Sequence, residues 1–191
     1  QNYEDFPTTA VVAPLEINPQ MIMWDPDTYD INSWDDVKGT DAVINVFAGA
    51  AYTEWLVGAG IVDEDQIDPS YDGGPARFIA EGGAILQQGF ASQEPFNYEN
   101  TFTDWGKPVD FLLIHDSDFP IYQGAVAILD SNLDDAARSC LGALVPLIQQ
   151  SAVDFQNDPV ATNAAIVQAV IDLDSFWQLT DDSVANTVQT M

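Results

Sequence analysis

The sequence predicts an α/β protein with largely parallel sheets, because short apolar, β-branched segments alternate with segments of helical composition. Of its 191 residues, 47% are hydrophobic and 11% aromatic. This apolar content is enough for the core of one domain or of two small lobes, and it argues against disorder. The longest apolar stretches are interrupted within about ten residues, short of the roughly 20 that span a bilayer, so no transmembrane segment is expected.

Each predicted element follows from its local pattern. Apolar and β-branched runs predict strands at residues 8–15, 21–24, 42–47, 84–91, 109–115 and 123–129. Helical composition predicts helices at residues 50–57, 75–80, 133–155, 159–177 and 182–188. Gly49 separates the strand at 42–47 from its following helix, and Pro75 stands where a first helical residue would. Pro146 is expected to kink or divide the long helix that contains it.

The charge of the chain limits its partners. Four Lys and Arg face 31 Asp and Glu, which gives a net charge of −27 and an isoelectric point near 4.1. Such a surface repels phosphate backbones and anionic lipid headgroups, so nucleic-acid binding and membrane-surface binding are excluded. At molar salt the Debye length falls to about 3 Å, and the repulsion among carboxylates is largely screened. We therefore expect a salt-adapted protein, with an ordinary acidic extracytoplasmic protein as the alternative.

Residues for nucleophilic catalysis are scarce. His115 is the only histidine, and no Gly-x-Ser-x-Gly elbow presents a serine to it. The neighbours Asp116 and Ser117 follow His115 directly, and adjacency in sequence does not give triad geometry. Cys140 is the only cysteine, and it lies in an apolar helical stretch, where a buried and inert thiol is expected. We predict no catalytic residues.

Metal and cofactor motifs are also weak. Asp68, Ser70, Asp72 and Gly73 match the first half of an EF-hand loop, but Ile79 stands where a bidentate Glu is required. One His and one Cys cannot form a zinc site with the usual ligands. The chain has neither a Walker lysine after a glycine-rich loop nor a Gly-x-Gly-x-x-Gly fingerprint. We therefore predict no metal and no cofactor.

The remaining signal is a binding architecture. Residues 47–52 place small residues and free backbone N–H groups at a helix start that follows a strand, which suits a carboxylate, sulfonate or carbonyl oxygen. Residues 71–75 repeat this arrangement, and residues 88–95 form a strand that ends in polar groups and a proline. Each of these runs is also compatible with an ordinary turn or surface strand exit.

Several runs, taken in order, resemble the substrate-binding proteins of ABC transporters, in the branch that binds nitrate, sulfonates, taurine and thiamine precursors. The runs are Trp24-Asp25-Pro26 and residues 36–40, 71–78, 87–95 and 105–109, and the similarity extends over most of residues 8–190. The resemblance implies a fold like that of type II periplasmic binding proteins. In this fold two α/β lobes are joined by crossing strands and close on a solute.

The resemblance also implies a division of the chain. Residues 1–24 would end the first lobe and form the first hinge strand, and residues 25–90 would form the second lobe. Residues 91–191 would contain the return strand and the C-terminal helical part of the first lobe. About a hundred residues that open the first lobe in this family have no counterpart here, so the first lobe is expected to be incomplete.

Carried over by position, the resemblance implies a ligand-binding set. It consists of Trp24, Phe47, Gly49, Ala50, Tyr52, Tyr71, Asp72, Ser92, Gln93 and Glu94. Trp24 would stack on a planar ligand. Arg77 is the only base in the aligned runs, which favours a neutral or cationic heteroaromatic ligand whose ring N–H pairs with Glu94 or Asp72.

The function implied is that of an extracytoplasmic protein, lipid-anchored through a missing N-terminus, that delivers a small organic solute to an ABC permease without inserting into the membrane itself. The solute would be a thiamine-precursor-like heteroaromatic compound or a sulfonate- or nitrate-like anion. The alternatives are an enzyme on the same fold, similar to pyrimidine synthases or desulfinases, and a structural or adhesion domain.

Overall fold

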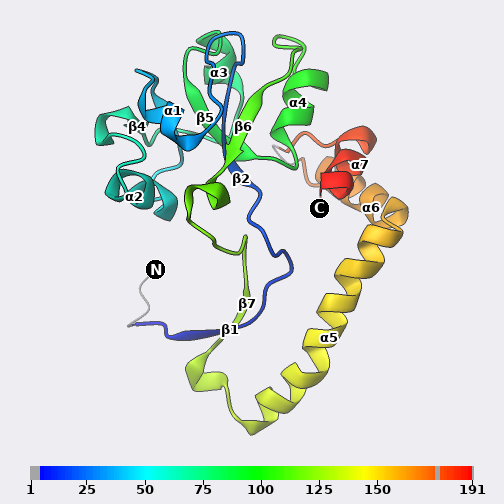
Figure 1. The fold of residues 1–191 in the computed structure, drawn as a ribbon. Helices are drawn as coiled ribbons and strands as arrows, with labels where there is room; N and C mark the ends of the chain where they lie inside the picture. Colours follow the sequence, from blue (N-terminus) through cyan, green and yellow to red (C-terminus); the bar gives the residue numbers. More distant parts are fainter. Residues whose placement is uncertain (1–4, 175–176, 191) are drawn as a thin grey trace. The chain divides into compact units, whose positions relative to one another are not determined.

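A computed structural model describes residues 5–174 and 177–190 (Figure 1). The chain divides into two compact units. Unit 1 consists of Gln1–Ile17 and Tyr122–Gln189 with residue 191, and unit 2 consists of Asn18–Ile121 with residue 190. Both units combine helices and strands, which confirms the predicted α/β class and its two bodies.

Unit 2 is built on a five-stranded sheet with the order β4-β3-β5-β2-β6. Its strands are β2 (Gln20–Trp24), β3 (Ile44–Asn45), β4 (Ile67–Asp68), β5 (Leu86–Phe90) and β6 (Asp110–Leu113). Strand β3 pairs in parallel with β4 and β5, whereas β2 pairs antiparallel with β5 and β6. The sheet is therefore mixed rather than largely parallel. A buried apolar strand has the same pattern in either direction, so the sequence does not reveal this reversal.

The helices of unit 2 follow its strands. They are α1 (Trp34–Lys38), α2 (Ala51–Gly58), α3 (Ala76–Ala80) and α4 (Glu94–Asn100), with 3-10 turns η1 (Glu64–Gln66) and η2 (Ile114–Ser117). The α4 helix stands at the start of residues 91–191, where the resemblance implies the extended return strand. Pro95 favours this outcome, because a helix start tolerates its missing N–H. Burial of Asn97 and Tyr98 then fixes α4 against the unit.

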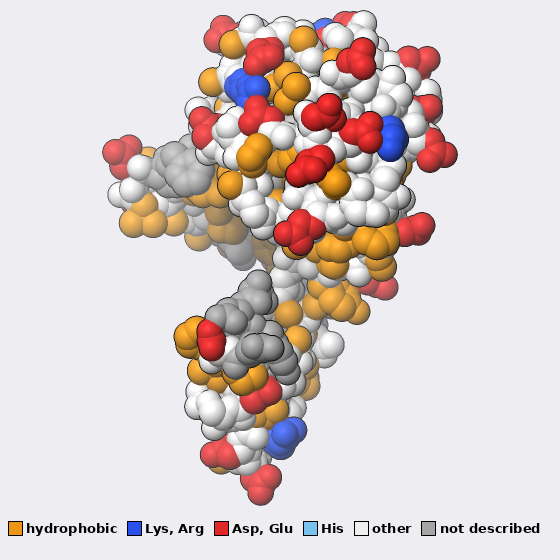
Figure 2. Space-filling model, turned by 90° about the vertical axis from the view of Figure 1, so that its left-hand side faces the viewer, with side chains coloured by type: hydrophobic (Ala, Val, Ile, Leu, Met, Phe, Trp, Pro, Cys, Tyr) orange, Lys and Arg blue, Asp and Glu red, His pale blue; other side chains and the backbone are white. Residues whose placement is uncertain are grey.

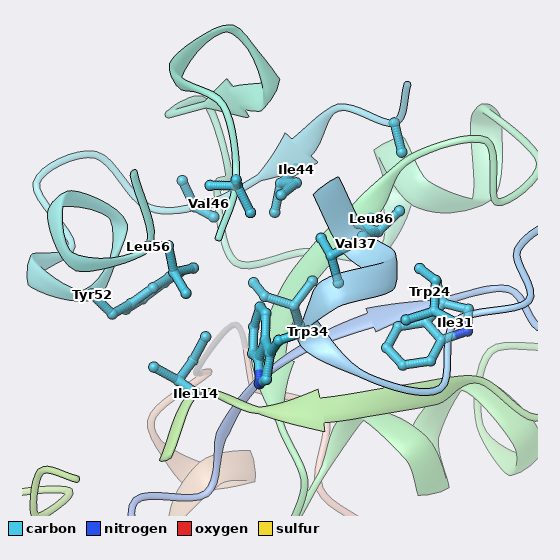
Figure 3. Packing of buried hydrophobic residues seen from close by; sticks show 13 residues of the cluster. Trp24, Ile31, Trp34, Val37, Ile44, Val46, Tyr52, Leu56, Leu86 and Ile114 are labelled. Carbon is cyan, nitrogen blue, oxygen red and sulfur yellow. The ribbon is translucent and has the colours of Figure 1, made fainter. Parts of the chain in front are cut away.

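Two apolar clusters hold unit 2 together, and β2 contributes to both. Ile22 and Trp24 belong to the larger cluster with α1 and α2, whereas Met21 and Met23 belong to the cluster with Phe78. Figure 3 shows the side chains of the larger cluster gathered from several elements. Because strand side chains alternate between faces, a strand buried on both sides is apolar throughout. This is why residues 21–24 were recognisable as a strand.

The unit boundaries differ from those that the resemblance implied. Unit 2 begins at Asn18 and ends at Ile121, rather than running from residue 25 to residue 90. The physical reason is strand pairing, because β2 lies between β5 and β6 and Ile22 pairs with Leu112. Residues 18–24 and 91–121 therefore belong to the body of unit 2.

The described residues of unit 1 form a two-stranded sheet and three helices. Strands β1 (Thr8–Val12) and β7 (Val126–Leu129) pair antiparallel, and η3 (Asp130–Asn132) precedes α5 (Asp135–Asn157), α6 (Val160–Asp172) and α7 (Asp181–Thr190). Figure 1 shows α5 as one long helix that Pro146 does not divide. No side chain of α5 is buried, so Cys140 is exposed, contrary to prediction. An apolar run is buried only where another element covers it, and none covers Cys140 among the described residues.

No helix in residues 5–174 and 177–190 is both long enough and apolar enough to cross a membrane.

We expect Lys107→Met to lower the free energy of unfolding by about 1–2 kcal/mol, because it removes a partner of a buried carboxylate. Lys107 Nζ lies 2.8 Å from Asp25, whose side chain is only 3% exposed, and 2.8 Å from the exposed Asp27. The Lys107 side chain is 36% exposed, which keeps the loss below that of a fully buried pair. Urea unfolding at low salt would measure the change.

Lys38→Met is the matched control, because both partners of the ion pair between Lys38 and Asp63 are exposed to solvent. Lys38 Nζ lies 3.0 Å from Asp63 Oδ1. We expect this variant to cost less than about 0.5 kcal/mol. Equal losses for the two variants would show that the burial of Asp25 contributes nothing.

Candidate functional site

The carboxyl edge of the unit 2 sheet contains a topological switch point. From β3 the chain proceeds to β4 on one side and then to β5 on the other, and both strands run parallel to β3. Connections that leave such neighbouring strands diverge, and open α/β sheets bind ligands in the crevice that results. The residues that follow β3, β4 and β5 are therefore the natural candidates for a site.

Seven side chains from these segments form what we call the switch-point cluster. They are Phe47 after β3, Tyr52 on α2, Tyr71 after β4, Gln87 and Gln88 in β5, and Glu94 and Tyr98 on α4. The cluster combines aromatic rings, two amides and one carboxyl group, a combination that can contact and hydrogen-bond a small polar molecule.

Gln88 links the segments after β3 to the centre of the sheet. Its Oε1 accepts hydrogen bonds from the Tyr52 hydroxyl (2.6 Å) and from the Phe47 N–H (3.2 Å). Among residues 5–174 and 177–190 its Nε2 has no hydrogen-bond partner, although the side chain is fully buried. An unpaired buried donor carries a free-energy penalty, so a native structure retains one only for a reason.

Gln87 makes a similar arrangement on the opposite face of β5. Its Nε2 donates to the Tyr98 hydroxyl at 3.0 Å, and its Oε1 is a buried acceptor without a hydrogen-bond partner among the described residues. Adjacent strand residues point to opposite faces, so β5 carries one incompletely paired amide on each side.

Tyr71 lies between the other members of the cluster. Its ring contacts that of Phe47, with centroids 4.7 Å apart and a tilt of 52°. Burial raises the pKa of Tyr71 above its ordinary value, and the charges of Glu94 and Asp72 raise it further. Burial likewise raises the pKa of Tyr52 and of Tyr98, with smaller effects from Tyr71. The three phenols are therefore neutral at pH 7 and able to donate hydrogen bonds.

The loop that carries Tyr71 is fixed by the strand beside it. The Tyr71 N–H donates to the Val46 carbonyl oxygen at 3.1 Å. With its amide oxygen facing the loop, Asn45 also accepts from the Tyr71 N–H (3.2 Å) and from Arg77 (2.9 Å). Arg77 forms ion pairs with Asp68 and, at 3.0 Å, with Glu81. Its guanidinium group thus holds the loop and is already neutralised.

Glu94 places a carboxyl group where β5 leaves the sheet. Its Oε2 accepts a hydrogen bond from the Phe90 N–H at 2.7 Å. Gly89 allows this approach, because a Cβ at position 89 would stand 2.9 Å from Glu94 Cγ. Burial raises the pKa of Glu94 above its ordinary value, and the hydrogen bonds to backbone N–H groups only partly offset that effect. No Lys or Arg of the described residues forms an ion pair with Glu94.

The structure brings four of the predicted site residues together: Phe47, Tyr52, Tyr71 and Glu94. The other predicted positions near them are Gly49 and Ala50 in the turn before α2, the exposed Asp72 beside Tyr71, and Ser92 and Gln93 in the turn before α4. Trp24 does not join them, because it pairs with Asp110 at the end of β2 that lies away from the switch-point cluster. Its side chain is only 2% exposed and packs in the larger apolar cluster.

Gln87, Gln88 and Tyr98 were not among the predicted site residues. One feature of the sequence could have indicated the two amides: Gln87 and Gln88 are adjacent polar residues inside a strand whose other members are apolar or glycine. Buried polar residues at the centre of a sheet are uncommon, and they are retained where they have partners or a function.

The partial EF-hand motif is a structural loop. Asp68 pairs with Arg77 and accepts from the Ser70 N–H at 3.1 Å, while Asp72 accepts from the Gly74 N–H at 2.9 Å. Within the described part of the chain, no three His, Cys, Asp or Glu side chains are arranged to hold a metal ion.

Comparison with solved structures finds a structural likeness, whereas comparison of the sequence finds no match. No family model and no curated protein matches the sequence. A solved structure of an ancestral arginine-binding protein bound to glutamine matches with a TM-score of 0.41 and 15% identity. The match covers 82% of this chain and 60% of that protein, so the chain spans about 60% of the length of the protein it matches.

Proposed function

We propose that this chain belongs to an extracytoplasmic solute-binding protein, which captures a small organic solute and delivers it to an ABC permease. The observation that carries the proposal is the switch-point cluster, with its incompletely paired amides Gln87 and Gln88 at the carboxyl edge of parallel strands. The ordered sequence runs that resemble ABC-transporter binding proteins support the same function.

Binding in this proposal requires no chemical step. The phenol of Tyr71 and the amide Nε2 of Gln88 can donate hydrogen bonds, and the carboxyl group of Glu94 can accept them. The rings of Phe47 and Tyr71 supply a surface for the apolar part of a solute. The solute then stabilises the conformation that makes these contacts, and a permease recognises that conformation.

A solute screen tests this function. We expect one or more compounds from a panel of amines, amino acids, aminopyrimidines, sulfonates and nitrate to raise the melting temperature of the 191-residue chain. A ligand that binds only the folded state stabilises it by about 2.7 kcal/mol at a hundred times its Kd. Tyr71→Phe should weaken binding of that compound by roughly 2- to 10-fold, the value of one hydrogen bond.

Tyr122→Phe is the matched control, because Tyr122 is 62% exposed and belongs to unit 1. It should leave the affinity unchanged. If no compound of any charge raised the melting temperature, or if both variants weakened binding equally, the proposed function would be contradicted.

A further inference from the structure

Every lysine and arginine of unit 2 already forms an ion pair. The full sequence has four Lys and Arg, of which Lys38, Arg77 and Lys107 lie in unit 2 and Arg138 in unit 1. Each of the three in unit 2 forms an ion pair with at least one carboxylate. Acidic side chains greatly outnumber basic ones on the molecular face in Figure 2. An anionic ligand would therefore meet no free positive side chain in this unit.

Unlike these bases, Glu94 has no oppositely charged partner among the described residues, and its carboxyl group is partly buried. It is close enough to Tyr71 and Tyr98 for its charge to raise the pKa of both phenols. Tyr98 accepts a hydrogen bond from Gln87, whose fully buried Oε1 has no hydrogen-bond partner in the part of the chain that the structure describes. This side of the cluster thus presents two acceptors that the protein itself leaves incompletely paired.

The aromatic members of the cluster suit the same kind of ligand. Phe47 is 41% exposed and packs against Tyr71, so part of the side chain is accessible to a bound molecule. Ring faces carry negative potential and attract ammonium and guanidinium groups, most strongly where water is partly excluded. Carboxylate, amide oxygen and ring faces all favour a positive charge that carries N–H donors.

On the basis of the proposed function, we infer that the switch-point cluster binds a small organic cation, whose protonated nitrogen pairs with Glu94 and lies against the rings of Phe47 and Tyr71. The class includes amines, amidines and protonated nitrogen heterocycles. Sulfonates, carboxylates and nitrate are excluded, because the Glu94 charge repels them and no free base compensates.

Three probes of similar size and different charge test this inference on the 191-residue chain. They are benzylammonium, benzyl alcohol and benzoate, measured by calorimetric titration at pH 7.5. We expect benzylammonium to bind at least tenfold more tightly than benzyl alcohol, and benzoate to bind most weakly. Glu94→Gln keeps an oxygen that can accept from the Phe90 N–H but removes the charge. It should weaken benzylammonium at least tenfold and leave benzyl alcohol within twofold.

Glu99→Gln is the matched control, because Glu99 is an exposed carboxylate on the same helix. It should leave both affinities within twofold. Benzoate binding as tightly as benzylammonium, equal weakening of both probes by Glu94→Gln, or no binding of any probe would overturn the inference. An anionic compound found by the solute screen would likewise overturn it while leaving the proposed function in place, whereas a screen without any stabilising compound contradicts the proposed function itself.

Discussion

Replacement of Phe78 by Ala is expected to lower the free energy of unfolding by about 3–5 kcal/mol, the range measured for buried phenylalanines. Phe78 on α3 is fully buried. Its ring centroid lies 5.2 Å from that of Tyr98 and 4.9 Å from that of Trp105, both in edge-on geometries. Its removal would leave a cavity beneath α3 and α4, and such close-packed aromatic contacts add about 0.5–1.5 kcal/mol per pair. Chemical denaturation would measure the change.

Phe111→Ala provides the control for this prediction. Phe111 lies on β6 and is 37% exposed, so its truncation leaves less of a cavity and should cost about 1 kcal/mol or less. Similar losses for the two variants would mean that Phe78 does not hold α3 and α4 in the way its contacts indicate.

Gly83→Ala is expected to lower the free energy of unfolding by about 3 kcal/mol. Part of this loss comes from backbone strain at a positive φ, and the rest from steric overlap of the new Cβ with its neighbours. Gly83 has a φ of +77°, which costs an L-residue about 1–2 kcal/mol. A Cβ there would stand 2.6 Å from Asp25 Cβ and 2.8 Å from the Trp105 ring, and such overpacking typically adds about 1–3 kcal/mol. Thermal and urea unfolding would measure the loss.

Gly82→Ala separates the two contributions. Gly82 also has a positive φ, +61°, but a Cβ at this position would meet no atom within 4 Å. We expect it to cost only the backbone contribution, about 1 kcal/mol. If Gly82→Ala were as damaging as Gly83→Ala, close packing against Asp25 and Trp105 would not explain the requirement for glycine at 83.

The sequence predicted most elements of the fold correctly in type and approximate position. β2 was recognisable as a strand because most of its residues are apolar, and α2 from the glycine turn before it. β5 falls within the strand predicted at residues 84–91, although it contains Gln87 and Gln88. The direction of β2 and the helix at α4 were not predicted. Both depend on contacts with distant segments, namely the pairing of β2 with β5 and β6 and the burial of Tyr98.

The candidate site was predictable only in part. Phe47, Tyr71 and Glu94 were named from the resemblance, and the structure places them after β3, β4 and β5, whose parallel ends share one edge of the sheet. The resemblance also implies Trp24 as a site residue, but antiparallel pairing places it beside Asp110, at the end of β2 away from the cluster. The amides of Gln87 and Gln88 were missed, because only strand pairing shows that both are buried at the switch point.

By itself, the amino-acid sequence determined the charge of the chain and the position of most helices and strands, since composition and hydrophobic periodicity are properties of neighbouring residues. Only the tertiary structure decided the strand order, the neutralisation of Arg77 by Asp68 and Glu81, and the gathering of Tyr71, Gln88 and Glu94 around one edge of the sheet. These features arise from strand pairing and burial between segments far apart in the chain, and no local pattern records which segments will meet.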